Sequence, residues 1–223
     1  MIPAVGFSGF VAFAIFSYFK YRRRLAFIDG YQWPNGLISR LQRHHPSLTR
    51  SDISRIEHGL KQFFRAHLKS GRGYVSMPSQ AADDLWHEFI LYTKSYDAFC
   101  GRAFGPFLHH TPAVVLANGR KQTNEGLRRV WWQCCKEDGI DPYDPKSLPA
   151  LFALDAALGI PGGFKYTPDC NKTDSGVSVE VQVGFGRRMQ CGGDFSSTAF
   201  DGGTDGLGDG GGDSGDGGGC GGD

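Results

Sequence analysis

The first residues of the chain constrain its fold most. The segment from Ile2 to Phe19 holds eighteen residues and no charge. As a helix it would be about 27 Å long, close to the roughly 30 Å hydrocarbon core of a bilayer. Its apolar residues would lie all round the helix, which disfavours a helix that lies in the membrane interface. The sequence therefore predicts an uncleaved transmembrane helix. The alternatives are a cleaved signal peptide and a helix that only lies in the interface or packs on the body.

Positive charge follows this segment directly, at Lys20, Arg22, Arg23 and Arg24. Signal peptides carry their positive charge before the apolar stretch, so this order favours an anchor over a cleaved signal. Short segments rich in Lys and Arg stay on the cytoplasmic side of a membrane. We therefore expect a single-pass membrane protein whose body and C-terminus are cytoplasmic.

The charge balance excludes some classes of partner. All 24 Lys and Arg residues precede position 200, and six of the 23 acidic residues follow it, so the body carries +7 and the tail −6. A surplus this small, spread over the body and without the motif of a nucleic-acid-binding fold, predicts no nucleic-acid partner. The six cysteines form no CxxC pair, which favours reduced thiols and a reducing compartment.

Apolar periodicity in the body predicts a mainly α fold. We expect a compact domain of about five to six helices, near residues 37–45, 51–70, 76–94, 95–103, 122–137 and 148–158. Ser51 and Ser76 are the expected N-caps of the second and third of these helices. The valines of residues 177–185 alternate with polar residues, which predicts one short strand or hairpin that could pair with residues 164–167.

The C-terminal segment has a different composition from the body. Residues 202–222 include 13 glycines, interrupted mainly by Asp, Ser and Cys. Such a segment buries too little apolar surface to offset its chain entropy, so we expect disorder. A calcium-binding repeat is a weak alternative, because its apolar positions are missing apart from Leu207. The predicted organisation is an anchor with basic flank (1–24), a helical body (29–190) and a disordered Gly/Asp-rich tail (191–223).

The candidate functional residues gather in the third helix and the segment after it. Asp83 and His87 lie one helical turn apart, so the carboxylate could orient the imidazole. The full candidate cluster is Asp83, Trp86, His87, Tyr96, Cys100, His109 and His110. His87, Cys100, His109 and His110 are ligand types that bind zinc or iron. Ordinary core packing, a metal site and a catalytic Cys-His pair are the three interpretations.

The other histidines belong to no recognisable metal-ligand motif in the sequence. No HExxH motif and no closely spaced Cys-His ligand motif occurs in the chain. We expect solvated or groove-lining side chains at His44, His45, His58 and His67.

A family resemblance rests on the candidate cluster. The string from Asp84 to Leu91, then Tyr96 and Phe99-Cys100, and then the residues from Phe107 to Pro112 resemble the conserved block of the glycine-rich domain-containing protein-like family. Residues 148–155 and 163–170 look similar to bacterial members that end in a Gly/Cys-rich tail. The resemblance implies that Trp86, His87, Tyr96, Cys100 and one histidine of the pair His109-His110 matter. It implies no established activity, and with the anchor it implies a bacterial inner-membrane location.

Two functions follow from these observations. The leading hypothesis is a non-enzymatic, membrane-anchored module on the cytoplasmic side that contacts the lipid bilayer and binds an unknown protein partner. The alternative is a metal-binding protein or metal-dependent enzyme that uses His87, Cys100 and His109 or His110.

Overall fold

The computed structural model describes residues 5–110, 125–168, 190–191 and 195. Within these residues the protein is mainly helical, as predicted. The helices are α1 (Val5–Asp29), α2 (Leu37–His44), α3 (Arg50–Lys69), α4 (Gln80–Leu91), α5 (Thr93–Ala103), α7 (Glu125–Asp138) and α8 (Ala150–Leu158). Two short strands, β1 (Tyr166–Thr167) and β2 (Gln190–Cys191), pair in parallel.

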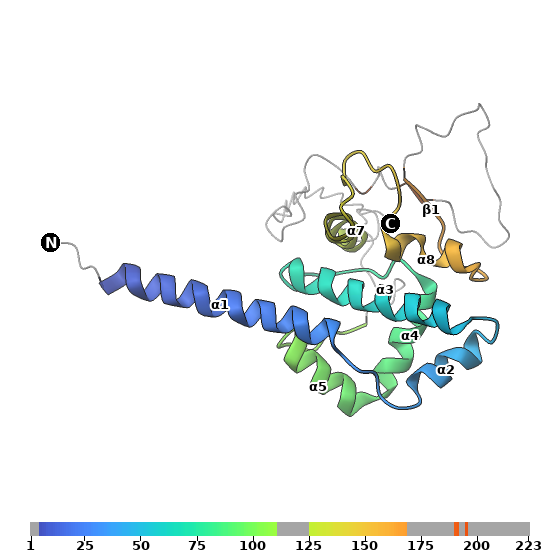
Figure 1. Cartoon of the computed structure of the whole chain (residues 1–223), viewed down its shortest axis with the longest axis horizontal. Coiled ribbons are helices and arrows are strands. Elements are labelled where there is room, and N and C mark those ends of the chain that lie inside the picture. Colours follow the sequence, from blue (N-terminus) through green and yellow to red (C-terminus); the bar gives the residue numbers. More distant parts are fainter. Residues whose placement is uncertain (1–4, 111–124, 169–189, 192–194, 196–223) are drawn as a thin grey trace, which may run out of the picture.

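Helix α3 lies at the centre of the body (Figure 1). It packs against α1, α4, α7 and α8. The apolar side chains that recur at spacings of three and four along it are all buried, as the sequence predicted: Ile53, Ile56, Leu60, Phe63, Phe64 and Leu68. The periodicity of one helix thus identified the core of the domain.

The starts of α3 and α4 differ from their predicted positions. Thr49, not Ser51, caps α3, because its hydroxyl accepts from the Asp52 N–H at 3.2 Å while Asp52 accepts from the Thr49 N–H at 3.0 Å. This reciprocal pair satisfies two backbone donors at once, which a lone serine does not. Ser79, not Ser76, caps α4 by accepting from the Ala82 N–H at 3.2 Å.

Two aromatic clusters fill the core on either side of α3. One, formed by residues of α3, α4, α5 and the end of α1, includes ring contacts of Phe99 with Phe64 at 4.9 Å and with Phe27 at 5.7 Å. The other joins Trp131 of α7 to Phe152 of α8 at 5.1 Å. Phe195, which the sequence analysis places in the tail, packs against both of these rings and is 1% exposed.

A helix, α1, lies in the apolar N-terminal segment, where the sequence predicted one. Among the residues that the structure describes, no helix is both long and apolar enough to cross a membrane. The transmembrane prediction is therefore not supported.

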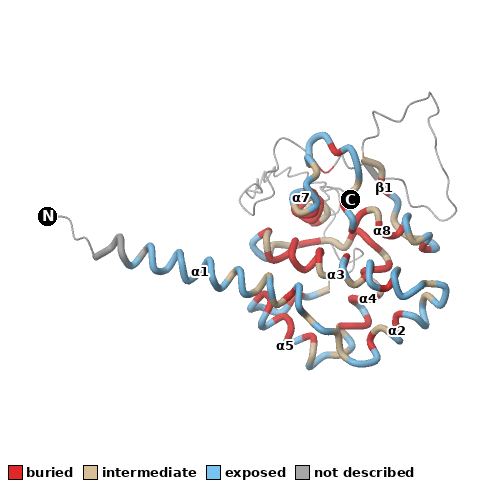
Figure 2. The backbone as a smooth tube through the Cα atoms, in the orientation of Figure 1, coloured by how far each residue is buried: buried red, intermediate tan, exposed pale blue. Residues whose placement is uncertain are grey.

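The two ends of α1 have different surroundings. Its first part projects away from the body, and residues 11–20 are exposed (Figure 2). Its last turns pack on α3 and α5, and Ile28 is fully buried. Large apolar side chains are exposed on the projecting part, at Val11, Phe13, Ile15, Phe16, Tyr18 and Phe19.

The strand prediction is tested only in part. β1 lies inside residues 164–167, the segment expected to pair, and its partner is Gln190–Cys191. The predicted strand at residues 177–185 lies outside the described residues, as does the glycine-rich stretch 202–222.

Candidate metal centre

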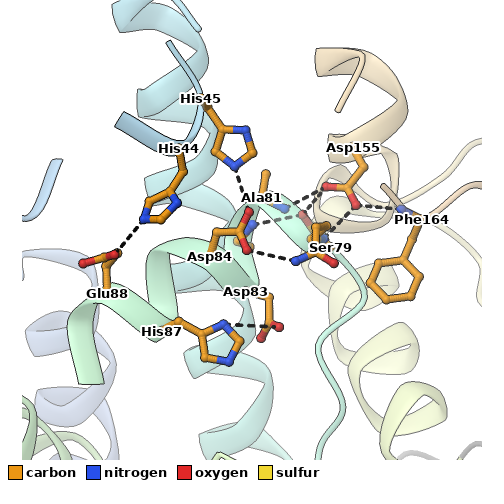
Figure 3. A network of polar contacts seen from close by, with 12 residues as sticks. His44, His45, Ser79, Ala81, Asp83, Asp84, His87, Glu88, Asp155 and Phe164 are labelled. Carbon is orange, nitrogen blue, oxygen red and sulfur yellow. Dashed lines mark hydrogen bonds and ion pairs between the residues drawn. The ribbon is translucent and has the colours of Figure 1, made fainter. Parts of the chain in front are cut away.

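Three side chains of the predicted cluster converge at one point. They are Asp83 and His87 of α4, and His110, which follows α5. Each offers one ligand atom, and these atoms all lie within 4.8 Å of one another. Asp83 Oδ1 lies 3.1 Å from His110 Nε2, and Asp83 Oδ2 lies 3.6 Å from His87 Nδ1. Figure 3 shows Asp83 and His87 side by side on α4, as their spacing predicted.

A reversal of the chain brings His110 back to α4. Helix α5 ends at Ala103, and the Gly105 N–H donates to the Cys100 carbonyl at 3.0 Å. Gly105 has a φ of 96°, in the left-handed region that favours glycine. The chain then returns past α4, so His110 faces a carboxylate 27 positions earlier.

A buried hydrogen-bond chain holds this returning segment in place. The Trp86 indole N–H donates to the Tyr96 hydroxyl at 3.0 Å, and the Tyr96 hydroxyl donates to the Leu108 carbonyl at 2.5 Å. The ring of Trp86 also packs against that of His110, with centroids 4.7 Å apart. Trp86 and Tyr96 thus hold the segment that leads to His110, and neither belongs to the group of three potential metal ligands.

Cys100 belongs to this supporting layer. It is fully buried, and it is not part of the group formed by Asp83, His87 and His110. Burial raises the pKa of the Cys100 thiol, while contacts with the Leu108 backbone and the Tyr96 hydroxyl act in the opposite direction. A thiol that is held protonated and buried packs as a small apolar side chain.

The structure separates the two adjacent histidines. His109 is exposed, and its ring lies 4.8 Å from that of Phe107. His110 is half-buried, and the centroid of its ring lies 4.3 Å from the centroid of the His87 ring. Of the two histidines between which the sequence analysis left the choice open, His110 is the one that faces Asp83.

Burial also changes the electrostatics of Asp83. Desolvation raises the pKa of its carboxyl, and the neighbouring His87 and His110 act to lower it. A half-buried carboxylate beside two imidazoles is a site where a cation would replace lost hydration. Asp83 and His110 are half-buried and His87 is exposed, so the group opens to solvent on the His87 side.

Helix α4 carries two further carboxylate-histidine pairs that the sequence analysis missed. Asp84 contacts His45 at 2.7 Å, and Glu88 contacts His44 at 2.9 Å (Figure 3). Glu88 also pairs with Arg40. The sequence feature that could have indicated these pairs is the presence of acidic residues on α4 and of two adjacent histidines, His44 and His45, at the end of α2. Each pair has a single histidine, so neither forms a group of three potential metal ligands.

His67 was also placed wrongly, as a solvated or groove-lining side chain. It is only 5% exposed, and its Nδ1 lies 3.1 Å from the Gly73 carbonyl oxygen. Its ring packs against Phe104 with centroids 4.9 Å apart. It lies on the inner face of α3, where periodicity could have placed it.

Comparison with known families places the chain but names no activity. The UCP032817-like family model matches residues 23–195, which include the whole candidate centre. No curated protein and no solved structure matches the chain. The resemblance to the glycine-rich domain-containing protein-like family is therefore wrong: the short block around Trp86 and His87 was too small a pattern to distinguish the two families. The chain belongs to the UCP032817-like family.

Proposed function

We propose that this protein binds one divalent transition-metal ion, zinc or iron(II), through Asp83, His87 and His110. The observation that carries the proposal is the approach of their three ligand atoms to within 4.8 Å of one another. Two histidines and one carboxylate are a ligand set that both metals use.

The distances are compatible with a shared ion after a small movement. Ligand bonds of about 2.0–2.2 Å allow two ligand atoms to lie at most about 4.4 Å apart. Asp83 and His110, at 3.1 Å, already satisfy this limit. His87 has a side chain that is 51% exposed, so a rotation about its side-chain bonds can bring its ring nitrogen closer without disturbing the core.

The supporting residues favour a preorganised site. The Trp86–Tyr96–Leu108 hydrogen bonds fix the backbone that leads to His110. Three protein ligands leave coordination positions free, and the exposed side of His87 would give a small molecule access to them. Such a centre could bind a substrate directly at the metal.

Metal titration of the purified full chain tests the proposal. We expect one zinc or iron(II) ion per chain, with affinity at least 100-fold lower in His87→Ala, His110→Ala and Asp83→Asn. His109→Ala is the matched control, because His109 is adjacent in sequence but exposed and outside the group. Circular dichroism confirms that each variant folds. A folded protein that takes up no metal, or an equal loss in His109→Ala, would overturn the proposal.

Cobalt substitution tests the role of Cys100. A cobalt–thiolate bond gives an intense charge-transfer band, which histidine and carboxylate ligands do not give. We expect cobalt(II) to bind without this band, because Cys100 is buried outside the ligand group. A thiolate band that disappears in Cys100→Ala would reject the ligand set proposed here.

The competing proposal is a metal-free module that binds a protein partner. The exposed apolar side chains of α1 favour it, because large exposed apolar patches often mark interaction surfaces. In that case Asp83, His87 and His110 form only a hydrogen-bonded group, and the metal titration gives a folded protein with no bound ion.

We further propose that the body works at the cytoplasmic face of a membrane. Cys100, Cys134 and Cys135 are free and buried, which suits a compartment that keeps thiols reduced. The cations that follow the apolar part of α1 suit the negative surface of a membrane.

A further inference from the structure

A pocket of about 470 Å³ lies where α1 meets α5. Four cationic side chains line it: Lys20, Arg23 and Arg24 of α1, and Arg102 of α5. The other lining residues are Phe16, Phe19, Phe27 and Gly101, and none of the lining residues is acidic. We call this feature the basic-aromatic pocket.

The four cations of the pocket have no acidic partner within the part of the chain that the structure describes. The ion pairs found among the described residues use other cations, such as Arg40, Arg65 and Arg129, and none includes a cation of the pocket. Arg102 instead lies over the ring of Phe27, 4.2 Å from its centroid. Burial and the positive charge of Arg72 lower the pKa of Arg24. Positive charges that crowd together in this way are stabilised by a bound anion.

The apolar surface beside the pocket narrows the choice of anion. Phe16 and Phe19 line the pocket and also belong to the exposed apolar part of α1, where they are 65% and 61% exposed. A free phosphate ion would match the cations but leave both rings in water. An amphiphile with an anionic head and an apolar body would satisfy both parts.

We propose that the basic-aromatic pocket binds the phosphate headgroup of an anionic phospholipid, while the exposed apolar side chains of α1 enter the lipid surface beside it. This proposal rests on the membrane location proposed above, for which it names the lipid-binding site. It does not depend on the metal centre. It requires the helix to enter one leaflet only.

Vesicle flotation with the purified full chain tests this proposal. We expect the protein to bind vesicles of phosphatidylcholine mixed with phosphatidylglycerol at least tenfold more tightly than vesicles of phosphatidylcholine alone. The double variant Arg23→Gln/Arg102→Gln should weaken binding to the anionic vesicles roughly 30-fold. The matched control Arg43→Gln/Arg50→Gln removes the same charge from exposed positions on α2 and α3, and it should bind nearly as the parent does.

Three outcomes would overturn the proposal. Equal binding to the two kinds of vesicle would show that charge is not recognised, and equal weakening by the two double variants would show that the pocket is not used. Complete release by millimolar inorganic phosphate at constant ionic strength would assign the pocket to free phosphate. His87→Ala should bind vesicles as the parent does, so failure of the metal proposal leaves this test intact.

Discussion

Asp155 of α8 accepts a hydrogen bond from the Ser79 hydroxyl at 2.7 Å and so joins α8 to the start of α4. The same carboxylate accepts from the backbone N–H groups of Gln80 at 2.7 Å, Ala81 at 3.1 Å and Phe164 at 2.8 Å. It is 2% exposed. One side chain therefore satisfies two backbone donors at the start of the helix that carries Asp83 and His87 (Figure 3).

We expect Asp155→Asn to lower the free energy of unfolding by about 2–3 kcal/mol. The amide keeps the shape of the carboxylate but turns an NH₂ group toward backbone donors, which leaves buried N–H groups unpaired. Urea denaturation measures the change. Asp144→Asn is the control, because Asp144 pairs with Lys146 at an exposed site and should cost less than about 0.5 kcal/mol. Similar costs for the two variants would contradict this account of Asp155.

A second prediction concerns the contact between α3 and α8. A Cβ at Gly59 would lie 3.0 Å from Leu154 Cδ2 and 3.2 Å from Leu151 Cδ1, and both leucines are buried. Overpacking costs about 1–3 kcal/mol, against a gain of about 1 kcal/mol in helix propensity. We therefore expect Gly59→Ala to lower the stability by about 1 kcal/mol.

Gly101→Ala should act in the opposite direction, because Gly101 is also helical but has nothing within 4 Å of its Cβ position. It should gain about 0.5–1 kcal/mol from propensity alone. Thermal unfolding of the two variants measures the difference. A stabilised Gly59→Ala protein would show that α3 and α8 can move apart at little cost.

A third prediction concerns the pH dependence of stability. Burial lowers the pKa of His67 to about 4, with Arg72 adding to the effect and the Gly73 carbonyl opposing it. In the unfolded chain the pKa of histidine is about 6.5. Between these values the unfolded chain binds more protons than the folded protein, so stability falls as the pH decreases from about 6.5 to about 4. The total loss from this group is of the order of 3 kcal/mol.

His67→Gln should reduce this loss, because glutamine does not titrate and can still donate to the Gly73 carbonyl. Urea denaturation at pH 7 and pH 5 measures the slope. His58→Gln is the control, a matched change at an exposed position of the same helix. A slope in His67→Gln equal to that of the parent would mean that the pKa of His67 is nearly the same in the folded protein and in the unfolded chain.

A fourth prediction links the core to the candidate metal centre. Tyr96→Phe removes the hydroxyl that joins Trp86 to the Leu108 carbonyl. We expect a loss of stability of about 1–3 kcal/mol and a metal affinity that is lower by roughly 10–100-fold. Tyr92→Phe loses only an exposed 3.3 Å hydrogen bond to the Asn35 carbonyl and should change neither quantity much. Unchanged metal affinity in a destabilised Tyr96→Phe protein would show that His110 is positioned by other contacts.

The sequence predicted side-chain positions best where the residues concerned lie on a single helix. The buried face of α3 and the pairing of Asp83 with His87 both follow from the helical repeat. The helix caps were harder to predict, because more than one Ser or Thr lies near the start of α3 and of α4. At α3 the reciprocal hydrogen bonds between Thr49 and Asp52 determine which residue is the cap.

The sequence failed where residues meet across long separations. His110 reaches Asp83 only because the chain reverses at Gly105, and Asp155 meets Ser79 across 76 positions. The thiol of Cys100 is a suitable metal ligand, but Cys100 lies on the inner side of α5 and is buried. Ligand types indicate which chemistry is available, and the path of the chain decides which of them come together.

Helix α1 runs unbroken from Val5 to Asp29, and its last turns are fixed in the core by Ile28. Because α1 is continuous and its last turns are packed into the body, a surface that bound Phe16 and Phe19 would also orient the domain. The same contact would then influence which way the side chains of Asp83 and His87 face.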